Sequence, residues 1–305
     1  MTTTWASDSH VVIVAGKGGV GSSTVAAALS ILAARQGADV LLIAVDGKPG
    51  LGPLLGGTAL TSSEQALRSV AGGGTIRGRT IPPEQAFGDY LDLKGIGSIV
   101  RRAASAVSLD LVAAATPGLE HLLVLGKIKE LERTSVADLI VVDAPPAGHA
   151  APFLRSASAL RRTVASGPVR VQAEEVSEML ADPARTQALL VTLAEETPVN
   201  EVIELAFDIE EDLGIALAPI VINACWPDRT GLSLATTAKL SAADRRALTA
   251  SNLFGAARLD VQREQLTRLA TALAIPSLRL PRLPTPRLTG EDLELLVDAL
   301  SAAAR

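Results

Sequence analysis

The chain has little cysteine, few aromatic side chains and no long apolar run. Cys225 is the only cysteine among 305 residues, which excludes an intrachain disulfide and a zinc site built from the cysteines of one chain. Aromatic residues make up 2% of the sequence while 48% is hydrophobic, so Ala, Leu, Val and Ile have to build the core. No window reaches the roughly 18 uncharged apolar residues of a membrane span. A membrane role is therefore expected to be peripheral at most.

Positive charge is also limited. The net charge of −5 and the pI near 5.4 argue against a nucleic-acid partner held by general electrostatics. The first ten residues lack the basic start and apolar run of a secretory signal, so we expect a cytoplasmic protein. Lysine is scarce, with six in the chain, at positions 17, 48, 94, 127, 129 and 239. Lys17 and Lys48 therefore merit separate consideration.

Apolar runs of strand length alternate with helical periods, which predicts an α/β fold with a mostly parallel sheet and helices on both faces. The predicted strands are 11–15, 40–45, 138–143, 188–193, 218–223 and a short 278–281. A weak strand near 75–81, together with residues 82–91, suggests one more edge element. Helical segments at about 93–132 and 150–183 are expected to form a helical subdomain at the sheet's carboxyl edge, inserted in a single domain of residues 1–305.

A glycine-rich loop, GKGGVGSST, follows the first predicted strand and precedes a helix-forming run. It aligns with G-x-x-x-x-G-K-[ST], the pattern of a loop whose backbone amides and helix N-terminus form a nest for polyphosphate. Ser23 stands where a hydroxyl normally coordinates Mg²⁺. The predicted ATP phosphate-binding residues are Gly16, Lys17, Gly18, Gly19, Val20, Gly21, Ser22, Ser23 and Thr24.

Ser22 occupies the position of the lysine that reaches the β- and γ-phosphates. A hydrogen bond to a charged group contributes about 1.5–3 kcal/mol, so its loss weakens phosphate binding by roughly 10- to 150-fold. Hydrolysis should suffer more, because phosphoryl transfer depends on preorganised positive charge around the γ-phosphate. The loop therefore predicts that nucleotide binding survives where turnover does not.

Several motifs resemble one family. KGGVG with Lys17 is similar to the deviant Walker A motif, KGGxGK[ST], of the arsenite-pump and tail-anchored-protein-targeting ATPases, the ArsA-like branch of the MinD/ParA group. DAPPAGHAAPFL at 143–154 resembles the switch II of that branch, and VDGKPG at 45–50 resembles its switch I. TPGLEHLLVLGKIKE, APIVIN and LRLPRLP extend the resemblance over nearly the whole chain. It looks closest to an actinobacterial-type subgroup of anion-transporting ATPases, whose members tend to occur as paired paralogues.

The resemblance implies a P-loop ATPase domain that uses ATP or ADP with Mg²⁺. It implies that Asp46 acts in catalysis by orienting the attacking water, that Lys17 enters the site of a partner subunit in trans, and that Ser23 and Asp143 serve Mg²⁺. The implied switch II residues are Asp143, Pro145, Gly148 and His149, and the implied adenine-binding residues are Asn223, Pro281 and Leu283. For Asn223, a simple turn residue is the alternative.

Other features of the family are missing here. The chain has neither the CxxC pair that binds zinc between targeting ATPases nor the cysteines that bind metalloid in arsenite pumps, so we expect no zinc and no arsenite site. Lys48 is either a solvated loop lysine, which we favour from the sequence, or a substitute in cis for the missing lysine.

Three functional hypotheses remain open at this point. In the first hypothesis, the chain is a dimeric switch driven by ATP binding, and its hydrolysis of ATP is weak or lost when it is alone. Alternatively, it is a non-hydrolysing regulatory subunit that donates Lys17 to an intact-loop paralogue in a heterodimer. The third hypothesis is a client-binding module for hydrophobic or membrane-associated partners, which depends on the apolar helices at 93–130.

Overall fold

The described part of the chain is built around a nine-stranded sheet that includes the apolar runs of the sequence. The computed structural model describes residues 9–45, 48–93, 116–227 and 240–303. The strands in these ranges are β1 (Val11–Gly16), β2 (Val40–Ala44), β3 (Gln65–Ser69), β4 (Thr75–Thr80), β5 (Leu139–Asp143), β6 (Thr186–Leu193), β7 (Ala216–Leu217), β8 (Ile220–Cys225) and β9 (Ser277–Pro281). The helices are α2 (Ser22–Arg35), α3 (Leu51–Leu54), α4 (Pro83–Leu93), α7 (Leu119–Arg133), α8 (Ala147–Thr163), α9 (Pro168–Ala181), α10 (Glu196–Phe207), the π-helix η1 (Asp208–Asp212), α11 (Ala242–Ala272) and α12 (Gly290–Ala303).

The sheet has the order β3-β4-β2-β5-β1-β6-β8-β9, and β7 pairs with β6. All of these pairs are parallel except β3 with β4. Strands β1, β2 and β5 are buried at every position, as expected for continuous apolar runs covered on both faces. The predicted α/β fold with a mostly parallel sheet is confirmed.

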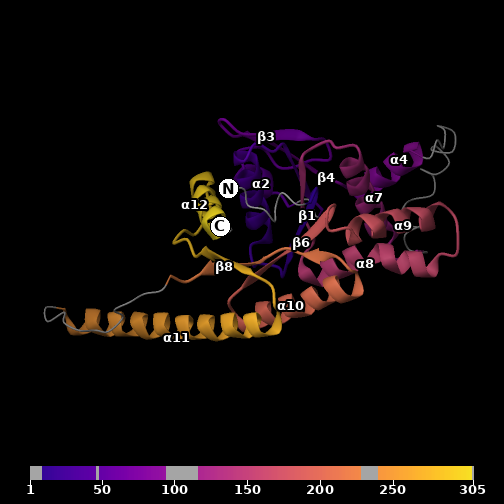
Figure 1. The fold of residues 1–305 in the computed structure, drawn as a ribbon. Coiled ribbons are helices and arrows are strands. Elements are labelled where there is room, and N and C mark those ends of the chain that lie inside the picture. Colours follow the sequence, from indigo (N-terminus) through magenta and orange to yellow (C-terminus); the bar gives the residue numbers. More distant parts are fainter. Residues whose placement is uncertain (1–8, 46–47, 94–115, 228–239, 304–305) are drawn as a thin grey trace.

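Helices cover both faces of the sheet because side chains alternate along each strand. Val12, Val14 and Leu42 pack on one face with α2, α3 and α12. Val11 and Ile13 pack on the other with α4, α7, α8, α9 and α10. Figure 1 shows α2 and α12 on one side of the sheet and α4, α7, α8 and α9 grouped on the other. The sheet is thus the middle of three layers.

The edge of the sheet differs from the sequence prediction. Residues 82–91, expected to belong to an edge element with a weak strand, lie almost entirely in helix α4. Strand β4 lies inside the sheet, and β3 is the edge strand. The prediction missed β3 because its sequence, QALRS, buries only Leu67 and carries no apolar run. Gly72, with φ 71°, lies in the turn between β3 and β4.

The helical segments also differ in detail. The segment predicted at 150–183 forms two helices, α8 and α9, and Gly167 at φ 99° precedes Pro168 at the start of α9. Buried residues of α7, α8 and α9 pack against a face of the sheet, and the expected position of these helices at the carboxyl edge stays a prediction. Residues 94–115 lie outside the described residues, so the inserted subdomain stays a prediction. Among the helices described, none is long and apolar enough to cross a membrane.

Candidate functional site

The glycine-rich loop connects the end of β1 to the start of α2, at the carboxyl edge of the sheet. Two other strands of the sheet bring side chains to the same edge. Asp143 ends β5 and lies in register with Val14 of β1 and Ala44 of β2. Asn223 lies near the end of β8, two strands from β1 on the other side. Parallel strands therefore gather the loop, Asp143 and Asn223, which are far apart in sequence.

The loop has a backbone that only glycine adopts easily. Gly19 has φ 92° and Gly21 has φ 90°, both in the left-handed region. Gly21 is the N-cap of α2 and makes no side-chain cap to the first amides of the helix, which are groups that an anionic ligand can accept from. Ser22 and Ser23 form the first turn of α2 and are partly exposed. The arrangement is a helix N-terminus suited to an anion.

Asn223 holds this loop in place. Its Nδ2 donates to the carbonyl oxygen of Val20 at 2.8 Å, and its Oδ1 accepts from the amide of Ala224 at 2.9 Å. A Cβ added to Gly21 would lie 2.3 Å from the same Nδ2. The side-chain amide is thus engaged with the loop. The predicted contact of Asn223 with adenine stays a prediction.

The other predicted adenine-binding residues lie beside the end of β8. Pro281 is paired in register with Cys225, and the amide of Arg282 donates to the carbonyl oxygen of Cys225 at 2.8 Å. Leu283 is partly buried against the core cluster that contains α2 and α12. The sequence order β8, then β9, thus brings these residues to the same edge as Asn223.

Asp143 and Lys48 form an ion pair at the centre of this edge. Asp143 is fully buried, and its Oδ1 lies 2.9 Å from Nζ of Lys48. The same ammonium donates to the carbonyl oxygen of Ala144 at 3.2 Å. The side chain of Lys48 is 25% exposed, so our preferred interpretation of a solvated loop lysine is wrong. Asp46 lies outside the described residues, and its predicted role stays a prediction.

Lys17 is held on the other side of the loop. Its Nζ lies 2.6 Å from Oε1 of Glu201, a residue of α10. Both side chains are partly exposed, at 36% and 35%. Glu201 could not be found from the sequence, because it belongs to no motif and is 184 residues away. The lysine of the deviant motif is therefore paired within its own chain.

The segment that resembles switch II runs from Asp143 into the first turn of α8. Pro145 is buried, whereas Gly148 and His149 are exposed. The amide of His149 donates to the carbonyl oxygen of Pro146 at 2.7 Å, which closes the first turn. A Cβ added to Gly18 would lie 3.8 Å from Cβ of Pro146, so this segment and the glycine-rich loop approach each other closely. The geometry allows a change at the loop to reach α8 directly.

The oxygen ligands of the site suit a magnesium ion. Mg²⁺ is usually bound through one or two carboxylates together with substrate phosphates and water, and Ser23 and Asp143 supply a hydroxyl and a carboxylate. In the described part of the chain, no group of three or more His, Cys, Asp or Glu residues is placed to hold a metal by itself. The residues therefore fit an ion that is held chiefly by a bound nucleotide.

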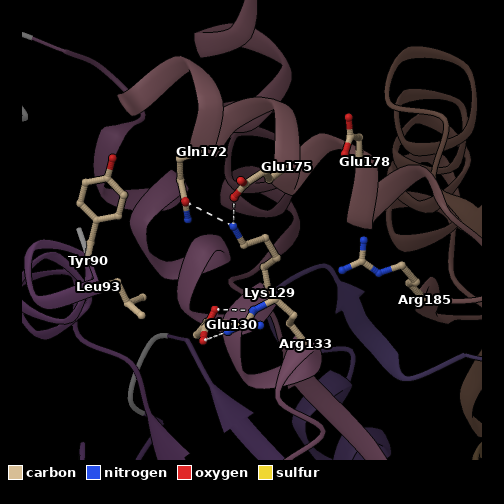
Figure 2. A pocket seen from close by; sticks show the side chains of 9 residues that line it. All are labelled: Tyr90, Leu93, Lys129, Glu130, Arg133, Gln172, Glu175, Glu178 and Arg185. Carbon is tan, nitrogen blue, oxygen red and sulfur yellow. Dashed lines mark hydrogen bonds and ion pairs between the residues drawn. The ribbon is translucent and has the colours of Figure 1, made fainter. Parts of the chain in front are cut away.

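Sequence reasoning did not predict a cavity of about 470 Å³ that lies between α4, α7 and α9 and is lined by other residues than those of the loop (Figure 2). Lys129 is paired there with Glu175 and donates to Oε1 of Gln172 at 3.3 Å. Arg133 pairs with Glu130 in the same wall. The remaining lining residues are Tyr90, Leu93, Glu178 and Arg185. Since α7 and α9 end where the chain enters β5 and β6, this cavity lies toward the amino ends of the strands.

Comparison with known proteins identifies the class of the domain. Residues 11–235 match the CobQ/CobB/MinD/ParA nucleotide binding domain. The chain therefore belongs to this family of P-loop domains, which agrees with the loop between β1 and α2.

Individual relatives are consistent with the ArsA-like family that the motifs predicted. ATPase BagA of Mycobacterium tuberculosis (strain ATCC 25618 / H37Rv) is 33% identical over 298 residues, covering 88% of this chain and 86% of the relative. The arsenical pump-driving ATPase of Acidiphilium multivorum is 30% identical over 206 residues, covering 67% of this chain and 33% of the relative. An arsenical pump-driving ATPase of Escherichia coli is also 30% identical over 206 residues, covering 66% of this chain and 32% of the relative.

Proposed function

We propose that this chain binds ATP or ADP at the Gly16–Thr24 loop and hydrolyses ATP slowly when alone. The observation that carries the proposal is the meeting of a glycine-rich helix N-terminus with Asp143 at the carboxyl edge of the sheet, while Ser22 opens α2. The loop amides and the helix dipole bind phosphate without a lysine. Turnover depends more heavily on charge placed at the γ-phosphate, which a neutral hydroxyl at position 22 does not provide.

Magnesium is part of the proposal. Ser23 and Asp143 would hold Mg²⁺ together with the nucleotide phosphates. When bound, the ion neutralises charge on the β- and γ-phosphates. The chain's own residues orient the nucleotide: the loop fixes the phosphates, Asn223 fixes the loop, and Pro146 brings switch II against Gly18.

A dimer completes the proposed function. Lys17 reaches to α10, where it pairs with Glu201 and is partly exposed. This position favours a lysine that serves a neighbouring subunit. The chain then acts as a nucleotide-dependent dimeric switch or, as the second candidate, as the regulatory subunit of a heterodimer that donates Lys17 in trans. The client-binding alternative depends on a segment that lies largely outside the described residues.

The experiment compares ATP binding and phosphate release for the wild type, Ser22→Lys and Ser22→Ala. We expect all three to bind ATP, and Ser22→Lys to bind roughly 10- to 150-fold more tightly, by one charged hydrogen bond. Phosphate release should rise in Ser22→Lys and stay low in Ser22→Ala. Failure of every variant to bind ATP overturns the proposal, as does rapid phosphate release by the wild type alone.

A mixing experiment tests the role in trans without needing to know a natural partner. The Ser22→Lys chain that also carries Lys17→Ala has an intact loop but lacks its own donor. Adding the wild-type chain supplies Lys17 and should increase phosphate release, whereas adding a Lys17→Ala chain should not. Equal phosphate release in the two mixtures removes the donor role.

A further inference from the structure

We infer that Lys48 is a cation built into the nucleotide site, and that it lets this chain bind nucleotide with little dependence on Mg²⁺. The inference rests on the proposed function, because it concerns the same loop. It assigns to Lys48 a role in nucleotide binding, whereas the motifs that the chain shares with its family assign none to this residue. Three observations support it: the burial of Asp143, the partners of the ammonium, and the position of those partners relative to β1.

The first observation concerns charge. Asp143 is 0% exposed, and a buried carboxylate needs a compensating charge in contact with it. In P-loop domains that charge comes from the metal ion on this aspartate. Here the ammonium of Lys48 supplies it directly, at 2.9 Å from Oδ1. The structure therefore contains a positive charge at the metal's carboxylate before any ion binds.

The second observation concerns the donors of the ammonium. A lysine has three N–H groups and no acceptor. Within the described residues, Asp143 and the carbonyl oxygen of Ala144 account for two of them. The side chain remains 25% exposed, so it is not sealed in the core. Counted over the described residues alone, one donor remains that can serve an anionic oxygen at the surface of the site.

The third observation places this donor beside the phosphate loop. The amide of Ala144 donates to the carbonyl oxygen of Val14 at 3.0 Å, two residues before Gly16. The carbonyl oxygen of Ala144 accepts from Lys48 and the amide of the same residue donates to β1, so Lys48 is linked through one residue to the strand that leads into the loop. Of the other lysines in the described ranges, Lys17 pairs with Glu201, and two on α7 pair with Asp89 and Glu175.

Together these relationships explain how the loop tolerates Ser22. Position 22 lacks the ammonium of the usual lysine. Lys48, which follows β2 in the chain, brings another ammonium to the same edge of the sheet. An ammonium pinned by a buried carboxylate is preorganised, so little is lost in ordering it when phosphate binds. Because the ammonium of Lys48 already neutralises Asp143, Mg²⁺ adds less to nucleotide affinity here than in a site where only the ion neutralises this carboxylate.

The test is calorimetric titration of ADP into the full chain, in Mg²⁺ and in EDTA. The variants are wild type, Lys48→Met and Lys48→Arg. Lys127→Met is the matched control, because it removes another ion-paired lysine whose partner is Asp89 on α4. The measured quantity is the ratio of Kd in EDTA to Kd in Mg²⁺, so the readout is binding rather than activity.

We expect this ratio to stay below about tenfold for wild type, Lys48→Arg and Lys127→Met. That factor is smaller than the change in affinity that one charged hydrogen bond contributes. In Lys48→Met we expect binding in EDTA to weaken by roughly 10- to 150-fold, with Mg²⁺ restoring much of it. A wild type that loses affinity in EDTA by more than this overturns the inference even where Lys48→Met does not fold. So does a Lys48→Met chain that binds more tightly than wild type in Mg²⁺, since Lys48 would then obstruct the ion.

These outcomes differ from failure of the proposed function. Absence of ADP binding by the wild type in both buffers removes the nucleotide site and the inference with it. Binding that requires Mg²⁺ in the wild type keeps the nucleotide site and removes only the role of Lys48.

Discussion

Lys17 of the glycine-rich loop pairs with Glu201 of α10, with 2.6 Å between Nζ and Oε1. The pair links the loop after β1 to the helix after β6, and the two strands are neighbours in the sheet. About a third of each side chain is exposed. Such pairs typically contribute about 0–1 kcal/mol, so the contact holds Lys17 in its own chain but releases it at little cost.

Glu201→Gln should therefore make Lys17 easier to donate to a partner. When the Glu201→Gln chain is mixed with the Ser22→Lys, Lys17→Ala chain, we expect phosphate release at subsaturating concentrations to rise by up to about fivefold over the wild-type mixture. Glu204→Gln on the exposed side of α10 is the control and should change nothing. A Glu201→Gln chain that lowers phosphate release contradicts the holding role.

The loop's conformation predicts different costs at two glycines. The Cβ of Gly19→Ala would meet no atom within 4 Å. The substitution therefore costs only the strain of a non-glycine residue in the left-handed conformation, about 1–2 kcal/mol in the free energy of unfolding or of nucleotide binding. Gly21→Ala has the same φ penalty and also places a Cβ 2.3 Å from Nδ2 of Asn223. We expect Gly21→Ala to be the more damaging in both thermal unfolding and ADP titration. Equal losses would show that Asn223 moves away freely.

Asn223 should matter through the hydrogen bond that it donates. Asn223→Asp can still accept from the amide of Ala224 but cannot donate to Val20, and it adds a negative charge beside the phosphate loop. We expect it to weaken ADP binding by more than tenfold, whereas Asn223→Ala loses about 0.5–1.5 kcal/mol from the hydrogen bond alone. Titration of both variants checks the order. If Asn223→Asp binds ADP as well as the wild type does, Asn223 does not hold the loop.

Acid stability should depend on a pair far from the loop. Glu132 is buried and accepts from Arg185 at 3.0 and 2.6 Å, with His10 nearby, and these hydrogen bonds and charges lower its pKa below the ordinary value of 4.5. The unfolded chain therefore binds this proton at a higher pH than the folded chain does. Glu132 contributes full stability above about pH 4.5, and the contribution is lost as pH falls through its lower folded pKa.

Glu132→Gln should reduce the unfolding free energy at neutral pH, by about 1–3 kcal/mol, and should flatten its decline below pH 4.5. Denaturant unfolding at several pH values measures both effects. The exposed Glu211→Gln is the control and should keep the wild-type slope. An unchanged slope in Glu132→Gln would mean that other carboxylates set the acid limit.

The sequence allowed much of this architecture to be predicted, for physical reasons. Strands β1, β2 and β5 are buried on both faces, so each is a nearly continuous apolar run. Such a run can be predicted as a strand from its own residues, without knowing which strands lie beside it. The loop was equally visible, because Gly19 and Gly21 are required by backbone conformation. Edge strand β3 was missed because an edge strand can remain polar.

The side-chain pairs of the site could not be predicted in the same way. Lys48 and Asp143 are 95 residues apart, and their contact depends on β2 and β5 being neighbours in the sheet. Lys17 and Glu201 depend likewise on β1 lying beside β6. The scarcity of lysine in the sequence singled out Lys17 and Lys48, but it did not predict their partners.

Ser22 is proposed to separate nucleotide binding from turnover. Equilibrium ATP binding and single-turnover phosphate release, measured on the same sample of the wild-type chain, test it most directly. We predict saturable ATP binding with phosphate release far slower than that of Ser22→Lys under identical conditions. Phosphate release by the wild type as fast as that of Ser22→Lys, or no ATP binding at all, would show that Ser22 does not separate the two.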